Sequence, residues 1–255
     1  MSEFQLTTGS VPGREHTRLM RNNQDGVGAN VEREVAVAVV TDGCGSGSSS
    51  EVGARLGAWF LTAKLPGLAR EFGVGPQLAT RASDALLTWM TSVVEPTMQD
   101  EALAGWVSEQ WLFTFLCAVM DSRKALVFGI GDGVWSADGG VGQVLVAAED
   151  NAPDYLGYRL VPKSLLSTKR EVGVPVVHFF GEAQQLAVAT DGLSGEAATL
   201  QKLCADKQVW RNPVALQRRL NVLAMKEKVL QDDATVALIK RSVDPLPTPP
   251  TRKED

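Results

Sequence analysis

The sequence predicts an α+β fold in which mostly antiparallel sheets are layered with helices. Three Val-rich apolar runs, residues 35–41, 126–131 and 186–190, have the length and composition of strands buried on both faces. Stretches with helical spacing fall between blocks of strands instead of alternating with single strands. Strict alternation would indicate a doubly wound parallel sheet, so the block pattern favours antiparallel sheets.

Further strands follow from composition and turn chemistry. Residues 111–120 read as a strand that the turn at residues 121–124 joins to the next apolar run, as in a hairpin. Two more strands are expected at residues 174–180 and 235–240. These segments are short and bounded by polar residues, which is typical of strands in a layered fold.

Four helices are expected from apolar side chains at helical spacing. The first covers residues 51–65, with serines before it as N-caps, and the second covers residues 78–94. Two C-terminal helices are expected at residues 195–206 and 213–225. Proline near the first turn of the last helix agrees with this assignment, because proline is tolerated where backbone N–H groups have no helical partner.

We expect a single domain over residues 1–242. A chain of 255 residues buries a sizeable core, and no change in composition marks an internal boundary. The proline-rich polar tail, residues 243–255, has a composition typical of disorder.

Composition also limits the partners and the compartment. A net charge of −5 without basic clusters argues against nucleic acid as a partner, and no apolar run is long enough to cross a bilayer. The N-terminus lacks the features of a signal peptide. Cys44, Cys117 and Cys204 are odd in number and far apart, which argues against a disulfide framework or a cysteine zinc site. We therefore expect a cytoplasmic protein, whose oligomeric state the sequence does not indicate.

Each of the three buried strands runs into an Asp-Gly pair, at Asp42, Asp132 and Asp191. A single Asp-Gly pair favours a hairpin turn. Three such pairs, with Asp25 upstream and Asp232 before the last strand, favour a shared site instead. Gathered aspartates at the ends of buried strands repel one another unless cations neutralise them. Because carboxylate and carbonyl oxygens suit Mg²⁺ or Mn²⁺, the sequence predicts a two-ion site for phosphate-ester hydrolysis.

The ordered set of motifs resembles the metal-dependent serine/threonine phosphatases of the protein phosphatase 2C type, and their bacterial branch in particular. The motifs are Gln24-Asp25, Thr41-Asp42-Gly43, Gly131-Asp132-Gly133, Thr190-Asp191-Gly192 and Asp232-Asp233-Ala234-Thr235. They follow that family's order over residues 9–241, which is almost the whole chain. The resemblance implies a four-layer α-β-β-α sandwich of two antiparallel sheets flanked by helices.

The resemblance also implies a ligand set for Mg²⁺ or Mn²⁺. Asp42 would bridge two metal ions, and the carbonyl of Gly43 would add a ligand to one of them. Asp191 and Asp232 would ligate the other ion, and Asp132 would hold a weaker third ion. Spacing alone does not decide between Asp232 and its neighbour Asp233; the family pattern selects Asp232.

The residues implied to act on the substrate are less regular. Asp25 would orient a water molecule, and Arg21 would grip the substrate phosphate, although it lies one residue out of the family register and Arg18 is the alternative. Cys44 stands where eukaryotic members carry a histidine that acts as general acid, and a neutral thiol is a poor proton donor. His16 is the one histidine near these motifs in sequence, and we expect a structural role for it, with a catalytic role as the alternative.

The resemblance implies a phosphatase that hydrolyses phosphoserine or phosphothreonine in a phosphorylated protein substrate. Two alternatives stay open. One is a non-catalytic regulatory or binding module on the same fold, which Cys44 and the shifted Arg21 favour. The other is a phosphodiesterase or nucleotidase that uses the same two-metal site. Residues 151–173, where the family places a variable flap, are expected to shape substrate choice.

Overall fold

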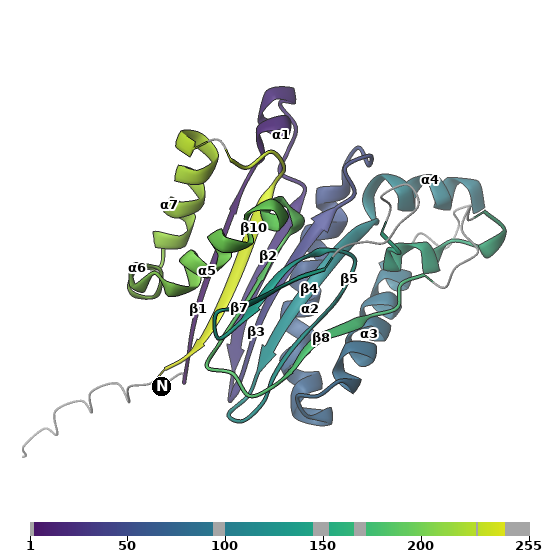
Figure 1. Cartoon of the computed structure of the whole chain (residues 1–255). Helices are drawn as coiled ribbons and strands as arrows, with labels where there is room; N and C mark the ends of the chain where they lie inside the picture. Colours follow the sequence, from purple (N-terminus) through teal and green to yellow (C-terminus); the bar gives the residue numbers. More distant parts are fainter. Residues whose placement is uncertain (1–2, 94–99, 145–152, 166–171, 228, 243–255) are drawn as a thin grey trace, which may run out of the picture.

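Two five-stranded sheets packed face to face form the centre of the computed structural model, and helices cover both outer faces (Figure 1). The structure describes residues 3–93, 100–144, 153–165, 172–227 and 229–242. The first sheet has the strand order β1-β10-β9-β6-β7, and the second has the order β2-β3-β4-β5-β8. Neighbouring strands are antiparallel throughout. The predicted α-β-β-α sandwich is confirmed.

The strands of the first sheet are β1 (Phe4–Val11), β6 (Gly133–Ala137), β7 (Gly140–Val144), β9 (Gln185–Ala189) and β10 (Ala234–Arg241). Those of the second sheet are β2 (Asp25–Glu32), β3 (Val35–Gly43), β4 (Phe113–Met120), β5 (Ala125–Ile130) and β8 (Val176–Gly181).

The α-helices are α1 (Arg14–Leu19), α2 (Ser50–Phe72), α3 (Gln77–Val93), α4 (Asp100–Gln110), α5 (Ala197–Ala205), α6 (Lys207–Arg211) and α7 (Ala215–Val222). Short 3-10 helices are η1 (Leu156–Leu160), η2 (Lys163–Leu165) and η3 (Asp191–Glu196), and η4 (Leu223–Glu227) is a π-helical turn. In the described part of the chain, no helix is both long and apolar enough to cross a membrane.

Strand β3 shows why the central runs of the sequence are apolar at every position. Val37 and Val39 point into the core between the second sheet and helices α2 and α3. Ala38 and Val40, which alternate with them, point into the core between the two sheets. Successive side chains of a strand face opposite sides, so a strand in a middle layer is buried on both faces.

Some predicted boundaries were wrong. The strand predicted from residue 111 begins at Phe113, because the N–H of Trp111 still bonds to the carbonyl of Val107 at the end of α4. Helix α2 extends past residue 65, through Pro66, because Ala69 in the next turn is also buried. No serine side chain caps its first turn: the N-cap, Ser49, makes no such hydrogen bond.

Near the C-terminus, the helix predicted over residues 195–206 is α-helical over Ala197–Ala205, after the 3-10 turn η3. The helix predicted over residues 213–225 is α-helical over Ala215–Val222 and then widens into the π-turn η4. The tail at residues 243–255, residue 94 of the second predicted helix, and residues 151–152 and 166–171 of the predicted flap lie outside the described residues.

Candidate metal centre

Asp25 and Asp42 lie opposite each other at the end of the second sheet. Asp25 opens β2, Asp42 is near the end of β3, and the antiparallel register pairs the two residues directly. Asp25 is only 3% exposed, and its Oδ2 accepts a hydrogen bond of 2.9 Å from the hydroxyl of Thr190. This bond links the two sheets, because Thr190 follows β9.

Burial changes the acidity of both carboxyl groups. It raises the pKa of Asp25 to about 8, against hydrogen bonds from Thr235 and Thr190, and the charges of Asp233 and Asp191 raise it further. Burial also raises the pKa of Asp42 well above its usual range, and the charges of Asp25 and Asp191 raise it further. A carboxyl group that is buried beside other carboxylates is therefore easier to protonate, unless a cation compensates the charge.

Asp191 and Asp232 come from the first sheet. Asp191 directly follows Thr190 and begins η3, and Asp232 precedes β10, the neighbour of β9. Burial raises the pKa of Asp191, and the charges of Asp232 and Asp233 add to this effect, whereas a hydrogen bond with Asp42 opposes it. The interaction between Asp191 and Asp42 joins the acidic ends of the two sheets.

Asp132 lies where the chain crosses from β5 in the second sheet to β6 in the first. Gly131 and Gly133 flank it with φ values of +96° and +141°, which disfavour any residue with a side chain. A Cβ atom on Gly131 would lie 2.3 Å from Cγ2 of Thr114, so the crossing requires glycine there for space as well. Burial and the charge of Asp191 raise the pKa of Asp132 to about 6.

The structure thus gathers the five predicted aspartates at one end of the sandwich, and we call them the acidic cluster. Its members are Asp25, Asp42, Asp132, Asp191 and Asp232. None of the three Asp-Gly pairs forms the tight hairpin turn that such a pair alone would favour.

The hydrogen bonding of two oxygens in the acidic cluster indicates whether the cluster suits a metal ion. Oδ1 of Asp25 and Oδ1 of Asp191 are buried and have no hydrogen-bond partner among the described residues. A buried, unpaired carboxylate oxygen is costly, and a cation removes that cost. Carboxylates are the hard oxygen donors that Mg²⁺ and Mn²⁺ prefer. The donor set therefore fits divalent metal ions.

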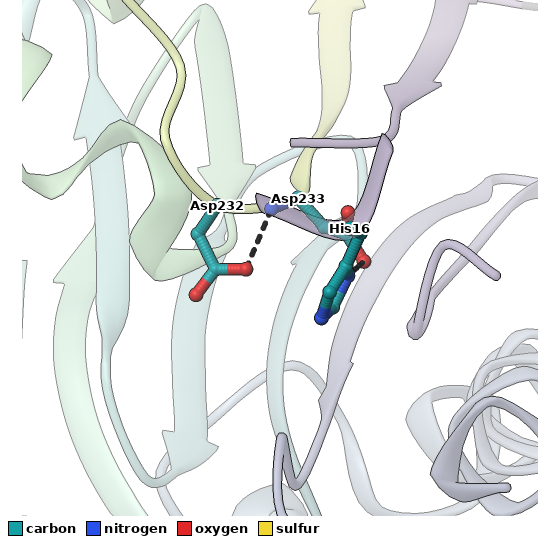
Figure 2. Close-up of side chains that lie close together, drawn as sticks. All are labelled: His16, Asp232 and Asp233. Atoms are coloured by element: carbon teal, nitrogen blue, oxygen red, sulfur yellow. Dashed lines mark hydrogen bonds and ion pairs between the residues drawn. The ribbon is translucent and has the colours of Figure 1, made fainter. Parts of the chain in front are cut away.

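Asp232 and Asp233 are adjacent but differ in their surroundings (Figure 2). Oδ1 of Asp233 accepts a hydrogen bond of 2.7 Å from the N–H of Gly13, and Oδ2 accepts one of 2.6 Å from the N–H of Gln24. Nδ1 of His16 lies 2.7 Å from the same Oδ2. Asp232 is exposed, and one of its oxygens accepts a hydrogen bond from the N–H of Asp233. Asp233 is therefore already satisfied, and Asp232 has capacity left for a ligand.

His16, Asp232 and Asp233 also bring ligand atoms within 4.8 Å of one another, a grouping able to hold a metal ion. The hydrogen bonds of Asp233 favour a different role for His16. His16 is 9% exposed and donates from Nδ1 to Asp233, an arrangement that fixes the turn carrying Asp232. The sequence analysis did not predict that Asp233 positions this turn. The pair of adjacent aspartates was the feature that could have indicated it.

The arginines of the predicted site are engaged elsewhere. The guanidinium of Arg21 donates to the carbonyls of Gly45 and Gly47 at 3.1 and 3.3 Å. Arg18 pairs with Glu15 on the surface of α1. Among the described residues, no hydrogen bond or ion pair joins either arginine to the acidic cluster.

Cys44 and Tyr155 lie beside the acidic cluster. Sγ of Cys44 is 3.1 Å from the hydroxyl of Ser46. Burial raises the pKa of the Tyr155 phenol far above its usual range, and Cys44, Asp42 and Asp132 raise it further. A neutral phenol therefore borders the site. No motif in the sequence pointed to Tyr155, which lies within the predicted flap.

The sequence profile of protein phosphatase 2C matches residues 12–231. The chain belongs to the protein phosphatase 2C family. No curated protein matches its sequence. The metal-binding and catalytic roles predicted above for individual residues remain predictions.

Solved structures share the protein phosphatase 2C fold with this chain. A bacterial serine phosphatase is 12% identical, with a TM-score of 0.57 and coverage of 94% of this chain and 99% of that one. The serine/threonine phosphatase PstP/Ppp of Mycobacterium tuberculosis is 16% identical, with a TM-score of 0.56 and coverage of 93% and 98%. The catalytic domain of PstP in complex with two manganese ions is 15% identical, with a TM-score of 0.54 and coverage of 93% and 97%. At this identity the likeness shows the fold.

Proposed function

We propose that this chain is a metal-dependent phosphoprotein phosphatase that hydrolyses phosphoserine and phosphothreonine with Mg²⁺ or Mn²⁺. The observation that carries the proposal is the acidic cluster, in which aspartates from both sheets meet and two buried carboxylate oxygens lack partners. Membership of the protein phosphatase 2C family supports the same reaction. The substrate class is a phosphorylated protein.

The residues of the acidic cluster divide into two groups in this proposal. Asp42 would bridge two metal ions, with the carbonyl of Gly43 on one ion, Asp191 and Asp232 on the other, and Asp132 on a weaker third. When bound, such ions neutralise phosphate oxygens and acidify water enough for it to attack phosphorus. The buried oxygen of Asp191 supports this arrangement, because it has no hydrogen-bond partner among the described residues and a metal ion would supply one.

Asp25 and Arg21 would act on the water and the substrate. The hydroxyl of Thr190 holds one oxygen of Asp25 and leaves the other free to accept a proton or orient a water molecule. Arg21 would have to exchange its bonds to the carbonyls of Gly45 and Gly47 for bonds to phosphate. Such an exchange favours the phosphate, because a guanidinium–phosphate pair carries charge on both partners and is often bidentate, whereas the carbonyls are neutral.

Hydrolysis of p-nitrophenyl phosphate tests the proposal. We expect activity with Mn²⁺ that chelator abolishes, and a loss of about a hundredfold or more in Asp191→Asn, since a catalytic metal contributes several kcal/mol. Glu71→Gln, on the exposed surface of α2, makes the same change of carboxylate to amide away from the site and should keep the activity of the parent. Activity of Asp191→Asn within about threefold of the parent would contradict the assigned ligand.

A non-catalytic binding module is the second candidate. Cys44 in place of a general acid and the engagement of Arg21 with loop carbonyls favour it. Hydrolysis assays separate the candidates, with calorimetric titration of Mn²⁺ beside them: a module hydrolyses neither aryl phosphate nor a phosphothreonine peptide, whether or not it binds the metal. Comparison of that peptide with a nucleotide and a phosphodiester distinguishes a protein phosphatase from a nucleotidase or phosphodiesterase.

A further inference from the structure

The end of the sandwich remote from the acidic cluster carries two adjoining hollows lined by basic side chains. Lys207, Arg211 and Lys240 line the first, which has a volume of about 330 Å³. Arg123 and Lys124 line the second, which has a volume of about 490 Å³. We call these five residues the basic groove.

Arg241 lines both hollows and joins them. Its guanidinium donates to the carbonyls of Ala183, Asp121 and Lys124, so that it ties the end of β10 to the second sheet. Because these bonds occupy the guanidinium of Arg241, the other cations that line the two hollows are the ones available to a ligand.

Positive charge in the first hollow has no paired counter-charge in the part of the chain that the structure describes. Among the described residues, no ion pair to a carboxylate involves Lys207, Arg211 or Lys240. Nζ of Lys240 lies 5.6 Å from the ring centroid of Trp210, a contact that orients the lysine without neutralising it. Lys207 and Arg211 are four residues apart on α6, so they project from the same face of the helix. In a chain of net charge −5, this concentration of cations selects an anion.

The second hollow extends the same charge across the end of the molecule. The acidic Glu182 also lines this hollow, but Nζ of Lys124 is 3.9 Å from its exposed carboxylate, which is a weak surface pair, and Arg123 is exposed. Two hollows that share a wall form an elongated surface, which suits an extended chain bearing several negative charges better than a single small anion.

The basic groove and the acidic cluster lie at opposite ends of β10. Figure 1 shows the course of this strand, with α1 near its beginning. Asp232 precedes the first residue of this strand, and Lys240 lies near its last. Eight residues of a strand span roughly 23 Å, so a connecting peptide needs at least about seven extended residues, and more because β10 is buried and the peptide must follow the outer surface. One polypeptide can therefore reach both.

We propose that the basic groove binds an acidic stretch of the phosphoprotein substrate, at a distance from the phosphorylated residue. The inference rests on the proposed function, which places the scissile phosphate at the acidic cluster. The acidic cluster repels additional negative charge, whereas the basic groove attracts it, so this docking orients a substrate with its acidic stretch away from the metal centre.

Binding of a fluorescein-labelled, Glu-rich peptide without phosphate tests the basic groove apart from catalysis. Fluorescence anisotropy is measured in chelator with the parent and with the double variant Lys207→Glu/Arg211→Glu. The variant should raise the Kd about tenfold or more, and added salt should weaken binding to the parent. The control Lys64→Glu/Arg218→Glu makes the same charge change at exposed positions outside the groove. Equal affinities of variant and control would overturn the proposal.

Kinetics then test docking of a substrate. Two phosphothreonine peptides are compared that share the phosphorylated segment and differ only in the presence of a Glu-rich stretch. In the parent the stretch should lower the KM about tenfold at unchanged kcat, and Lys207→Glu/Arg211→Glu should abolish that advantage while aryl phosphate hydrolysis stays unchanged. Equal KM values for both peptides in the parent would overturn substrate docking. Absence of all hydrolysis in the parent would refute the proposed function alone, and the anisotropy titration would still decide whether the groove binds acidic peptide.

Discussion

Asp25 combines burial with an unpaired oxygen, and this combination links its ionisation to folding. Its pKa rises from an ordinary value of 3.8 to about 8 in the metal-free fold. Between these values the folded protein holds a proton that the unfolded chain has released. Stability therefore falls as the pH rises through this window, because the unfolded state binds fewer protons than the folded state.

Replacing the ionisable carboxyl group of Asp25 should make the melting temperature depend less on pH. In chelator, the melting temperature of the parent should fall as the pH rises from about 4 to about 8, and Asp25→Asn should show a smaller fall. Asp42, Asp132 and Asp191 have pKa values shifted in the same direction, so part of the slope should remain. Thermal melts at a series of pH values measure it, and parallel profiles for parent and variant would contradict the raised pKa of Asp25.

The thiol of Cys44 leads to a second prediction, which concerns the leaving group of the phosphate ester. A thiol at the position of the family histidine donates a proton poorly, so rates should depend strongly on the leaving group. We expect aryl phosphates, whose leaving groups need little protonation, to be hydrolysed much faster than alkyl phosphates. Cys44→His should accelerate the alkyl substrates selectively. Similar rates of the parent on both classes would show that another group already supplies the proton.

At the scale of elements, the entry to β10 is held by α1. Gly13, at the N-cap of α1, donates to Asp233, and a Cβ atom on this glycine would lie 2.2 Å from the backbone of Asp232. The turn that presents Asp232 is thus positioned by contacts made through its neighbour, so the two adjacent aspartates should respond oppositely to substitution.

Asp233→Asn should destabilise the protein on the order of 1–3 kcal/mol with or without metal, because the amide cannot accept all the bonds of the carboxylate. Asp232→Asn should cost little stability in chelator but should reduce the stabilisation by Mn²⁺. Urea unfolding of both variants, each with chelator and with Mn²⁺, measures these effects. The reverse pattern would assign the metal to Asp233 and His16.

The elements also show what the sequence reveals. β3, β5 and β9 are predictable because both of their faces are buried, which leaves an uninterrupted apolar run. β1 is not, because burial alternates along it and its sequence includes Thr, Ser and Gly. α4 could not be predicted either, because Val107 is its one buried residue among those described, and a single buried position leaves no helical pattern of apolar residues.

The same limit applies to the candidate site. Asp-Gly pairs after apolar runs marked the acidic residues, but pairing register decides which of them meet, as between Asp25 and Asp42. The bonds of Asp233 to Gly13 and His16 span more than two hundred residues, and no local pattern encodes them. Tyr155 reaches the acidic cluster from an irregular segment for the same reason.

At the scale of the whole molecule, the acidic cluster should make stability depend on metal. Saturation at a hundred times the dissociation constant adds about 2.7 kcal/mol for one site, if the unfolded chain does not bind the ion. Asp42→Asn removes a carboxyl group whose ionisation burial and the neighbouring aspartates oppose, together with the proposed bridging ligand. In chelator this variant should melt no lower than the parent, while its stabilisation by Mn²⁺ should largely vanish.

Thermal melts of parent and Asp42→Asn, each with chelator and with Mn²⁺, provide the measurement. An aspartate that only shapes a turn would cost stability when replaced and would leave the metal response unchanged. A variant that is destabilised in chelator and still gains the full increase with Mn²⁺ would therefore exclude Asp42 as the bridging residue.

Arg241 gives the sandwich a mechanical asymmetry. It fastens the two sheets at one end through uncharged carbonyls, and those bonds depend on neither metal nor the pH of the carboxylates. At the other end the sheets meet through carboxyl groups that repel one another once ionised. Bound metal ions would offset this repulsion and hold the two sheets together there. Hydrogen bonds from Thr190 to Asp25 and from Gln24 to Asp233 join the sheets at that end as well, and they too involve carboxyl groups. The contact between the sheets is therefore sensitive to metal and to pH at the acidic end and insensitive to both at Arg241, so loss of metal should affect the acidic end first.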